Sequence, residues 1–202
     1  MRLPLFPLRT VLFPGGVLPL RVFETRYMDM VRNCLKDRSP FGVCAILGEQ
    51  SEVGAGAQPA PVGCLARIRE WDMTQLGVLK LRAVGDEKLR VLASRTQADG
   101  LLVGEVELLA PEPEHPLGAH HVACRRVLEG LLAAVPEAVS DDELGLPIEP
   151  PRRPDSAVWV GHRLAEWLPL PIPEKQALLE LSDPLARLDR LEALLERAAT
   201  VN

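Results

Sequence analysis

Residues 3–24 read LPLFPLRTVLFPGGVLPLRVFE, and this stretch carries the strongest signals of the fold. Short apolar runs alternate in it with proline and glycine, a pattern typical of short elements joined by turns. Leu18, Leu20 and Val22 recur at every second position, which is the period of a strand with one buried face. We therefore expect a strand over residues 17–23, with these three side chains in a core.

The residues on either side of this strand predict a turn and a corner. The Pro-Gly-Gly at residues 14–16 supplies a turn that few other residues could make. Pro19 has no N–H to donate, so it marks an edge strand or a bulge. Arg21 and Glu24 lie where the strand gives way to the next element, and we expect them to fix that corner.

The rest of the first half consists of short elements separated by turns. A helical stripe over residues 27–36 is followed by an apolar run at residues 41–47, as expected of a strand buried on both faces. Further strands are predicted at residues 64–69, 76–84, 89–96 and 102–108, with a hairpin turn at residues 98–100. Six or so short strands at close spacing favour a small barrel over strand–helix–strand units.

The pattern changes near Pro111 and is helical beyond it. An apolar stripe covers residues 124–135, and helix starts are predicted at Asp155, Pro173 and Asp183. Residues 136–154 are expected to form an acidic, proline-rich loop. We predict an α+β fold: a small twisted β-barrel with one early helix in residues 1–112, then a C-terminal α-helical bundle in residues 113–202, together one domain.

Composition narrows the classes of partner. The 202 residues carry a net charge of −5, and only residues 1–40 are basic, with 7 basic and 3 acidic groups. The net negative charge and the lack of a strongly basic segment speak against nucleic-acid binding, which needs a basic face. No stretch approaches the roughly 20 apolar residues of a membrane-spanning helix. The apolar N-terminus is interrupted by prolines, unlike a signal peptide. We expect a cytoplasmic protein.

Motifs for catalysis and cofactor binding are lacking in the sequence. No glycine is followed by lysine, so a phosphate-binding P-loop is excluded. No serine lies in a G-x-S-x-G motif. Four cysteines stand among apolar residues without a C-x-x-C pair, which favours buried free thiols. We predict no catalytic and no cofactor-binding residues.

The histidines offer the most tempting constellation. His120 and Cys124 are four residues apart on a predicted helix, a spacing that suits two ligands of a zinc site. However, Cys124 belongs to the apolar stripe, where a buried thiol needs no metal, and the sequence shows no third and fourth ligand. We therefore predict no metal site.

The opening stretch carries a family resemblance. The runs LPLFPL at residues 3–8, VLFPGG at residues 11–16 and LPLRVFE at residues 18–24 resemble the N-terminal substrate-binding domain of the Lon protease family. The late run LPL at residues 168–170 and the Asp-Pro at residues 183–184 are similar to the helices that close that domain. The chain departs from the family's G-x-x-R-F pattern, because its arginine comes five residues after Gly85 and a valine follows.

The resemblance implies a PUA-like, LON-domain-like barrel followed by helices, and a role in recognising unfolded or tagged protein substrates. The ATPase and protease modules of a full Lon protease do not fit in 202 residues. The chain is therefore expected to be a stand-alone, non-enzymatic module that binds unfolded or extended polypeptides or an unidentified protein partner. The sequence leaves its oligomeric state open.

A peptide groove is hypothesised beside the opening stretch, built from exposed strand edges and apolar pockets. Its candidate residues are Phe13, Pro14, Gly15, Gly16, Arg21, Glu24 and Tyr27. The alternative for the same residues is a purely structural role. For the whole chain, the alternatives are an assembly or regulatory protein that binds one partner through its acidic helical half, and a cryptic hydrolase or metal-dependent enzyme using residues 115–124.

Overall fold

All described strands lie in the first part of the chain, and most helices lie in the second part. The computed structural model describes residues 1–47, 58–75, 77–134 and 151–201. The strands are β1 (Arg2–Leu8), β2 (Val17–Val22), β3 (Phe41–Ala45), β4 (Val62–Gln75), β5 (Val78–Thr96) and β6 (Leu102–Leu108). The helices are α1 (Thr25–Asp37), α2 (Val122–Ala134), α3 (Ala157–Trp167), α4 (Ile172–Glu180) and α5 (Pro184–Val201).

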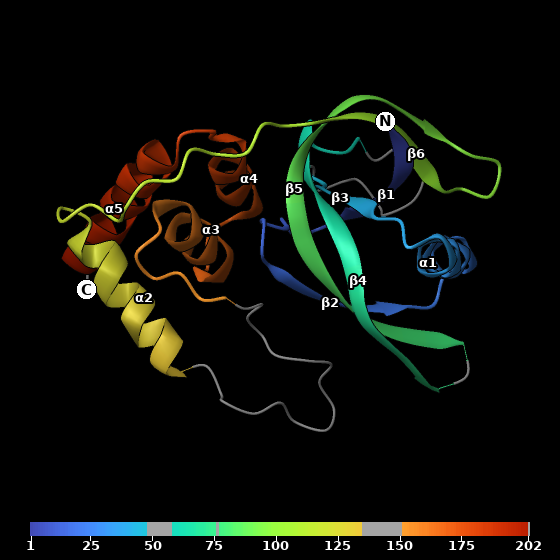
Figure 1. Cartoon of the computed structure of the whole chain (residues 1–202), viewed down its shortest axis with the longest axis horizontal. Coiled ribbons are helices and arrows are strands. Elements are labelled where there is room, and N and C mark those ends of the chain that lie inside the picture. Colours follow the sequence, from blue (N-terminus) through green and yellow to red (C-terminus); the bar gives the residue numbers. More distant parts are fainter. Residues whose placement is uncertain (48–57, 76, 135–150, 202) are drawn as a thin grey trace.

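The six strands form one sheet that closes on itself. Their order is β2-β5-β4-β3-β1-β6, and an additional β5–β6 pairing closes a ring of five strands, with β2 attached at the side (Figure 1). β1 and β3 are parallel, and the other pairs are antiparallel. The long β5 makes closure possible, because its first half pairs with β2 and its second half with β6. The predicted small barrel is confirmed.

β1 is not predicted from the sequence, because it contains Pro4 and Pro7 and proline is rare inside a sheet. Residues 2–5 of β1 pair with β6, and residues 5–8 pair with β3. Pro4 is thus paired only with β6 and Pro7 only with β3, so each proline has one strand neighbour. The two missing N–H groups therefore fall where β1 behaves locally as an edge.

The two strands predicted at residues 76–84 and 89–96 are one. β5 runs through Gly85 without a break. A Cβ at Gly85 would lie 2.2 Å from the carbonyl oxygen of Phe13, so glycine is needed there for the close approach of another segment and not for a turn. The predicted turn at residues 98–100 is confirmed, with Gly100 at φ 83°.

The barrel interior and α1 share one apolar core. Tyr27, Met30 and Val31 of α1 pack with Phe41 of β3 and Leu81 of β5, and all five are nearly or fully buried. These α1 positions match the stripe expected from the sequence. α1 therefore packs against the apolar side chains of the barrel interior.

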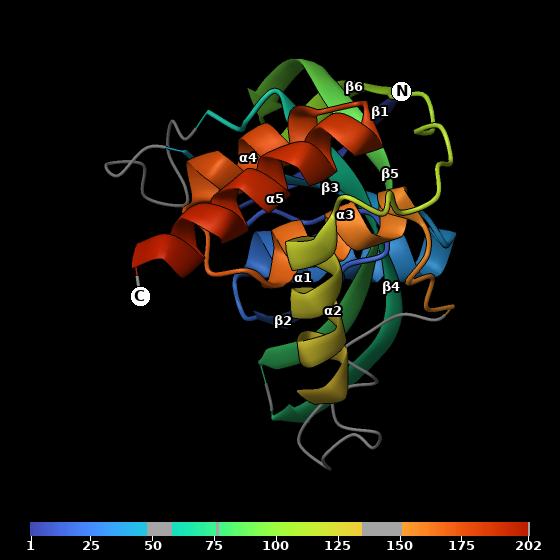
Figure 2. The ribbon, with the colours of Figure 1, turned by 90° about the vertical axis from the view of Figure 1, so that its left-hand side faces the viewer.

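The remaining helices lie on the other side of the barrel, in front of the strands in Figure 2, and they have their own apolar core.

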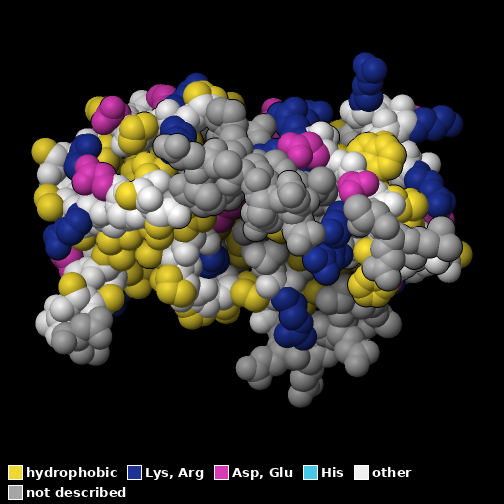
Figure 3. Space-filling model, turned by 90° about the horizontal axis from the view of Figure 1, so that it is seen from below, with side chains coloured by type: hydrophobic (Ala, Val, Ile, Leu, Met, Phe, Trp, Pro, Cys, Tyr) yellow, Lys and Arg dark blue, Asp and Glu magenta, His cyan; other side chains and the backbone are white. Residues whose placement is uncertain are grey.

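α3 begins one residue later than predicted. Ser156, not Asp155, is the N-cap, and its hydroxyl accepts from the Trp159 N–H at 3.2 Å. Asp183 caps α5 as predicted, accepting from the Leu185 N–H at 2.9 Å. Apolar side chains gather over this half at the left of Figure 3.

Candidate functional site

The Pro-Gly-Gly turn is bound to β5. Gly15 N–H donates to the Gly85 carbonyl at 2.8 Å, and Gly85 N–H donates to the Gly16 carbonyl at 2.9 Å. Gly15 has φ 69°, a conformation that glycine adopts without strain. The predicted turn is therefore present.

The same turn is also where α3 attaches to the barrel. The Arg163 guanidinium of α3 donates to the carbonyls of Pro14, at 2.7 Å, and of Gly15. Arg163 is 1% exposed and lies 3.1 Å from the Glu166 carboxylate. Phe13 is fully buried in the helical core. These contacts give the turn a structural role, and its place in a peptide groove stays a prediction.

The corner before α1 is held by a small polar cluster. Arg26 binds the Glu24 carboxylate at 2.6 Å and the Gly100 carbonyl at 3.1 Å, and its guanidinium lies 4.8 Å from the centre of the Tyr27 ring. Tyr27 is buried and stacks on Phe6 with ring centres 4.2 Å apart. The corner thus uses Glu24, as expected, together with Arg26.

Arg21 is the other residue that was expected to fix this corner, and its side chain is exposed. It lies on β2, between the exposed Pro19 and Phe23. The edge of β2 lacks two N–H donors, since Pro19 has no N–H and the Val17 N–H already donates to the Glu166 carboxylate. The β2 edge therefore offers an added strand fewer N–H donors than an edge without proline.

An open cleft lies where the barrel meets the helical half, and we call it the junction cleft. Its volume is about 350 Å³, and Pro14 is the one residue of the predicted groove that lines it. The other apolar walls come from Leu109, Ala110, Pro111 and Val158. The charged or polar lining residues are Asp86, Glu87, Lys88, Glu112, Glu114, Arg153 and His162.

The cleft coincides with a gap in the strand ladder. On this side of β5, β2 pairs up to Val84 and β6 pairs from Leu89. Among the described residues, β5 has no strand partner on that side in the interval. The Pro-Gly-Gly turn and the segment that follows β6 border this gap, because they hydrogen-bond β5 at Gly85 and Lys88. The cleft therefore results from the way the barrel closes.

Beneath the cleft lies a buried group of charges. The Glu112 carboxylate is 2.6 Å from Lys88 Nζ and accepts from Arg187 Nη1 at 2.7 Å. The Lys88 and Glu112 side chains are each 4% exposed, and Arg187 is fully buried. Lys88 Nζ also donates to the carbonyls of Leu179 and Leu181, at 3.1 and 2.8 Å. A lysine of β5 thus sits at the carboxyl end of α4, where the helix dipole favours a cation.

Burial and pairing shift the titration of this group. Burial alone would raise the pKa of Glu112, but the nearby His162 ring, at 3.4 Å, and the hydrogen bonds and charge of Arg187 lower it well below its usual range. Burial lowers the pKa of His162 to about 4. Lys88 has a lowered pKa, again mainly through burial. At neutral pH His162 is therefore neutral while Glu112 is ionised.

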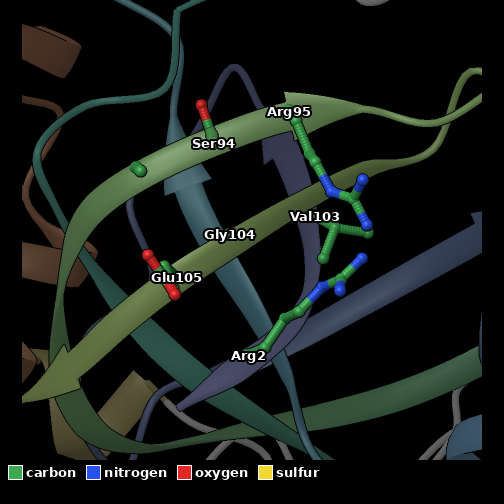
Figure 4. A pocket seen from close by; sticks show the side chains of 7 residues that line it. Arg2, Ser94, Arg95, Val103, Gly104 and Glu105 are labelled. Atoms are coloured by element: carbon green, nitrogen blue, oxygen red, sulfur yellow. The ribbon is translucent and has the colours of Figure 1, made fainter.

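A second hollow, of about 230 Å³, has a different character. It lies over β1, β5 and β6, and in Figure 4 the guanidinium groups of Arg2 and Arg95 point to one end and Glu105 lies towards the other. Only Val103 and Ala93 give it apolar side chains. It suits a charged group, whereas the junction cleft has room for apolar side chains.

The cysteines are poor nucleophiles in this structure. All four are free and buried. Burial raises the pKa of Cys44 to about 12 and raises those of Cys64 and Cys124 further. Cys124 Sγ lies 3.8 Å from the Leu188 carbonyl oxygen, which accounts for its polar contact inside the helical core. A thiolate mechanism therefore gains no support.

Comparisons with known proteins find a family whose model matches nearly the whole chain. The family model for the ATP-dependent protease La (LON) substrate-binding domain matches residues 2–197. A crystal structure of a Lon N-terminal domain protein from Xanthomonas campestris is 40% identical, with a TM-score of 0.76 over 96% of this chain and 98% of that one. In the described part of the chain, no helix is long and apolar enough to cross a membrane.

Curated relatives include longer proteins. Lon protease 2 of Myxococcus xanthus is 28% identical over 96% of this chain and 23% of its own length. Protein cereblon of Danio rerio is 32% identical over 53% of this chain and 25% of its own length. The chain thus spans about a quarter of the length of the curated relatives it matches.

Proposed function

The chain belongs to the family of LON substrate-binding domains, and from this premise we propose that it binds unfolded or extended polypeptides in the junction cleft. The observation that carries the proposal is the junction cleft, whose apolar walls lie beside the gap between the partners β2 and β6 along β5. Recognition of an extended chain needs pockets for side chains beside accessible backbone. The alternative edge at β2 lacks two N–H donors, as described above.

The cleft suits a short apolar stretch of the bound polypeptide. Its volume of about 350 Å³ accommodates one or two apolar side chains between Pro14, Leu109 and Val158. Glu87 and Glu114, both exposed, line the cleft; Arg153 also lines it and lies 3.6 Å from the Glu114 carboxylate, so Glu87 is the carboxylate without that basic neighbour. We therefore expect apolar segments flanked by lysine or arginine to bind more tightly than segments with acidic flanks.

We further propose that binding is the whole activity of this chain and that it acts in the cytoplasm. The buried, protonated thiols support the first statement, because a nucleophilic cysteine would need a lowered pKa and access to substrate. Four free buried cysteines support the second, since reducing compartments keep thiols unpaired.

The test is fluorescence anisotropy of a labelled, permanently unfolded polypeptide titrated with the protein, beside its folded counterpart. We expect saturable binding of the unfolded form alone at micromolar strength, about −8 kcal/mol. Val158→Arg fills the cleft from α3 and should weaken binding at least tenfold. Leu92→Arg is the matched control, because Leu92 is 62% exposed on β5 outside the cleft lining.

The outcomes separate the function from its location. If Val158→Arg binds as tightly as the parent protein while keeping its circular dichroism spectrum, the cleft is not the site. If the parent protein binds no unfolded polypeptide, the proposed function fails. A defined complex with one folded protein would then favour the assembly or regulatory alternative.

A further inference from the structure

Three side chains from distant parts of the sequence meet beside the helical bundle. His120 and His121 immediately precede α2, and Asp189 lies in the second turn of α5. The Asp189 Oδ1 atom is 2.9 Å from His121 Nε2 and 3.5 Å from His120 Nε2. One ligand atom from each of the three residues lies within 4.8 Å of the other two.

These separations fit the coordination shell of a metal ion. Bonds of about 2.0–2.1 Å from a tetrahedral zinc ion to nitrogen and oxygen place neighbouring ligand atoms about 3.3–3.4 Å apart. The 3.5 Å separation meets this value, and the 2.9 Å separation is a hydrogen bond that must lengthen by about half an ångström. His120 and Asp189 have side chains 72% and 63% exposed, so both have room for that adjustment.

His121 supplies the fixed part of the arrangement. Its side chain is fully buried, so its ring orientation is set by packing before any ion arrives. Its Nε2 points at the exposed Asp189 carboxylate, while its Nδ1 is buried and has no hydrogen-bond partner in the described part of the chain. Without an ion, the Asp189 carboxylate accepts from Nε2–H; an ion that replaces this hydrogen bond requires the ring proton to reside on Nδ1, where no other hydrogen bond competes for it.

We propose that His120, His121 and Asp189 form a binding site for a divalent first-row transition ion, with zinc as the expected occupant. Two imidazoles and one carboxylate are borderline donors that suit zinc, whereas magnesium and calcium prefer shells made of oxygen. Three protein ligands leave one tetrahedral position for water. A bound ion would connect the start of α2 to α5 and stabilise the helical half.

Sequence spacing alone pointed to a different pair. His120 and Cys124 share a helical spacing, but Cys124 is buried and contacts the Leu188 carbonyl. The third ligand, Asp189, lies 68 residues after His121, and the packing of α5 against α2 brings it into place. The backbone N–H groups of Ala123 and Cys124 donate to Glu192, at 2.7 and 2.8 Å, which fixes the two helices together at this point.

The test is isothermal titration of the metal-free full chain with zinc, together with the absorption spectrum of the cobalt-loaded protein. We expect one zinc ion per chain, no comparable binding of magnesium, and a thermal midpoint raised by about 2–6 °C at saturating zinc. Cobalt should show visible bands of a nitrogen and oxygen shell without the intense near-ultraviolet band of a thiolate ligand, which separates this site from the cysteines.

Variants at the two exposed ligands test the assignment without disturbing the core. His120→Ala and Asp189→Asn should each weaken zinc binding at least tenfold and abolish the thermal shift. His115→Ala is the matched control, a histidine outside the cluster that should leave both unchanged. Absence of stoichiometric zinc binding, unchanged binding in both variants, or a thiolate band with cobalt would each overturn the proposal.

Discussion

The barrel interior and the joint between barrel and helices are both buried, but the interior is apolar and the joint is charged. The barrel core consists of apolar side chains such as Phe41, Val43 and Leu81. The joint places the charged groups of Lys88, Glu112 and Arg187 out of water and satisfies them with one another and with helix carbonyls. Apolar packing tolerates changes of shape that conserve volume, whereas a buried charge depends on every one of its partners.

The joint therefore makes the relative placement of the two halves specific. Glu112 lies in the linker after β6, Lys88 in β5 and Arg187 in α5, and Arg163 of α3 holds the Pro-Gly-Gly turn. A slip of any element by one residue would leave a charge without its partner. We propose on this basis that residues 1–112 and 113–202, the two predicted subdomains, act as one unit.

The largest effect is expected from Glu112→Gln. The substitution keeps the shape of the side chain but leaves the Lys88 and Arg187 charges buried without an anion. We expect a loss of about 3–5 kcal/mol in the free energy of unfolding, measured by urea denaturation.

The matched control is Glu174→Gln. Its partner is Arg190 at 2.8 Å, in a half-exposed pair, so we expect a loss below about 1 kcal/mol. Equal losses in the two variants would remove the distinction between a buried joint and an ordinary surface ion pair.

Acid should weaken the joint before it weakens the barrel core. Between pH 6.5 and about 4, the unfolded chain binds a proton at His162 that the folded chain does not, so stability falls as pH drops through this window. The pKa of Glu112 is also lowered in the folded chain, so its contribution is present above the unfolded pKa and is lost at still lower pH. At pH 5 we expect a loss on the order of 1–2 kcal/mol relative to pH 7 from His162.

Replacing the titrating ring tests this assignment. His162→Phe cannot bind a proton, so its stability should change less between pH 7 and pH 5 than that of the parent protein. The readout is the difference between the two pH values in urea denaturation, not the absolute stability of the variant. A slope identical to that of the parent protein would show that other groups cause the acid sensitivity.

The smallest effect is expected in the barrel core. Leu81 is 1% exposed and is surrounded by apolar side chains, so Leu81→Met conserves both volume and chemistry. We expect less than about 1.5 kcal/mol of destabilisation and no change in the pH dependence. A larger loss would mean that the barrel interior is as exacting as the joint, and the contrast between the two regions would disappear.

The predicted groove shows how far motif reasoning reaches. Phe13 and Tyr27 were singled out by a distinctive local pattern, and both side chains are buried. Of the seven predicted groove residues, Pro14 borders the junction cleft, while Leu109 and Val158 on its walls lie far along the chain with no local signal that marks them. A cleft formed by four separate segments of the chain leaves no pattern in any one of them.

Periodicity, turn residues and helix caps act over a few neighbouring residues, so the sequence predicted the small barrel, its early helix and the helical second half. The motifs of residues 3–24 indicated the family by resemblance. β1 could not be predicted in this way, since proline is tolerated inside a sheet only where one side of the strand is unpaired, and pairing is a tertiary property. Tertiary structure alone decided which distant polar groups meet: Lys88 with Glu112, Arg163 with the turn, and His121 with Asp189. At least one member of each pair is buried, and a buried polar group is costly unless it is paired, while nothing in the local sequence records its partner.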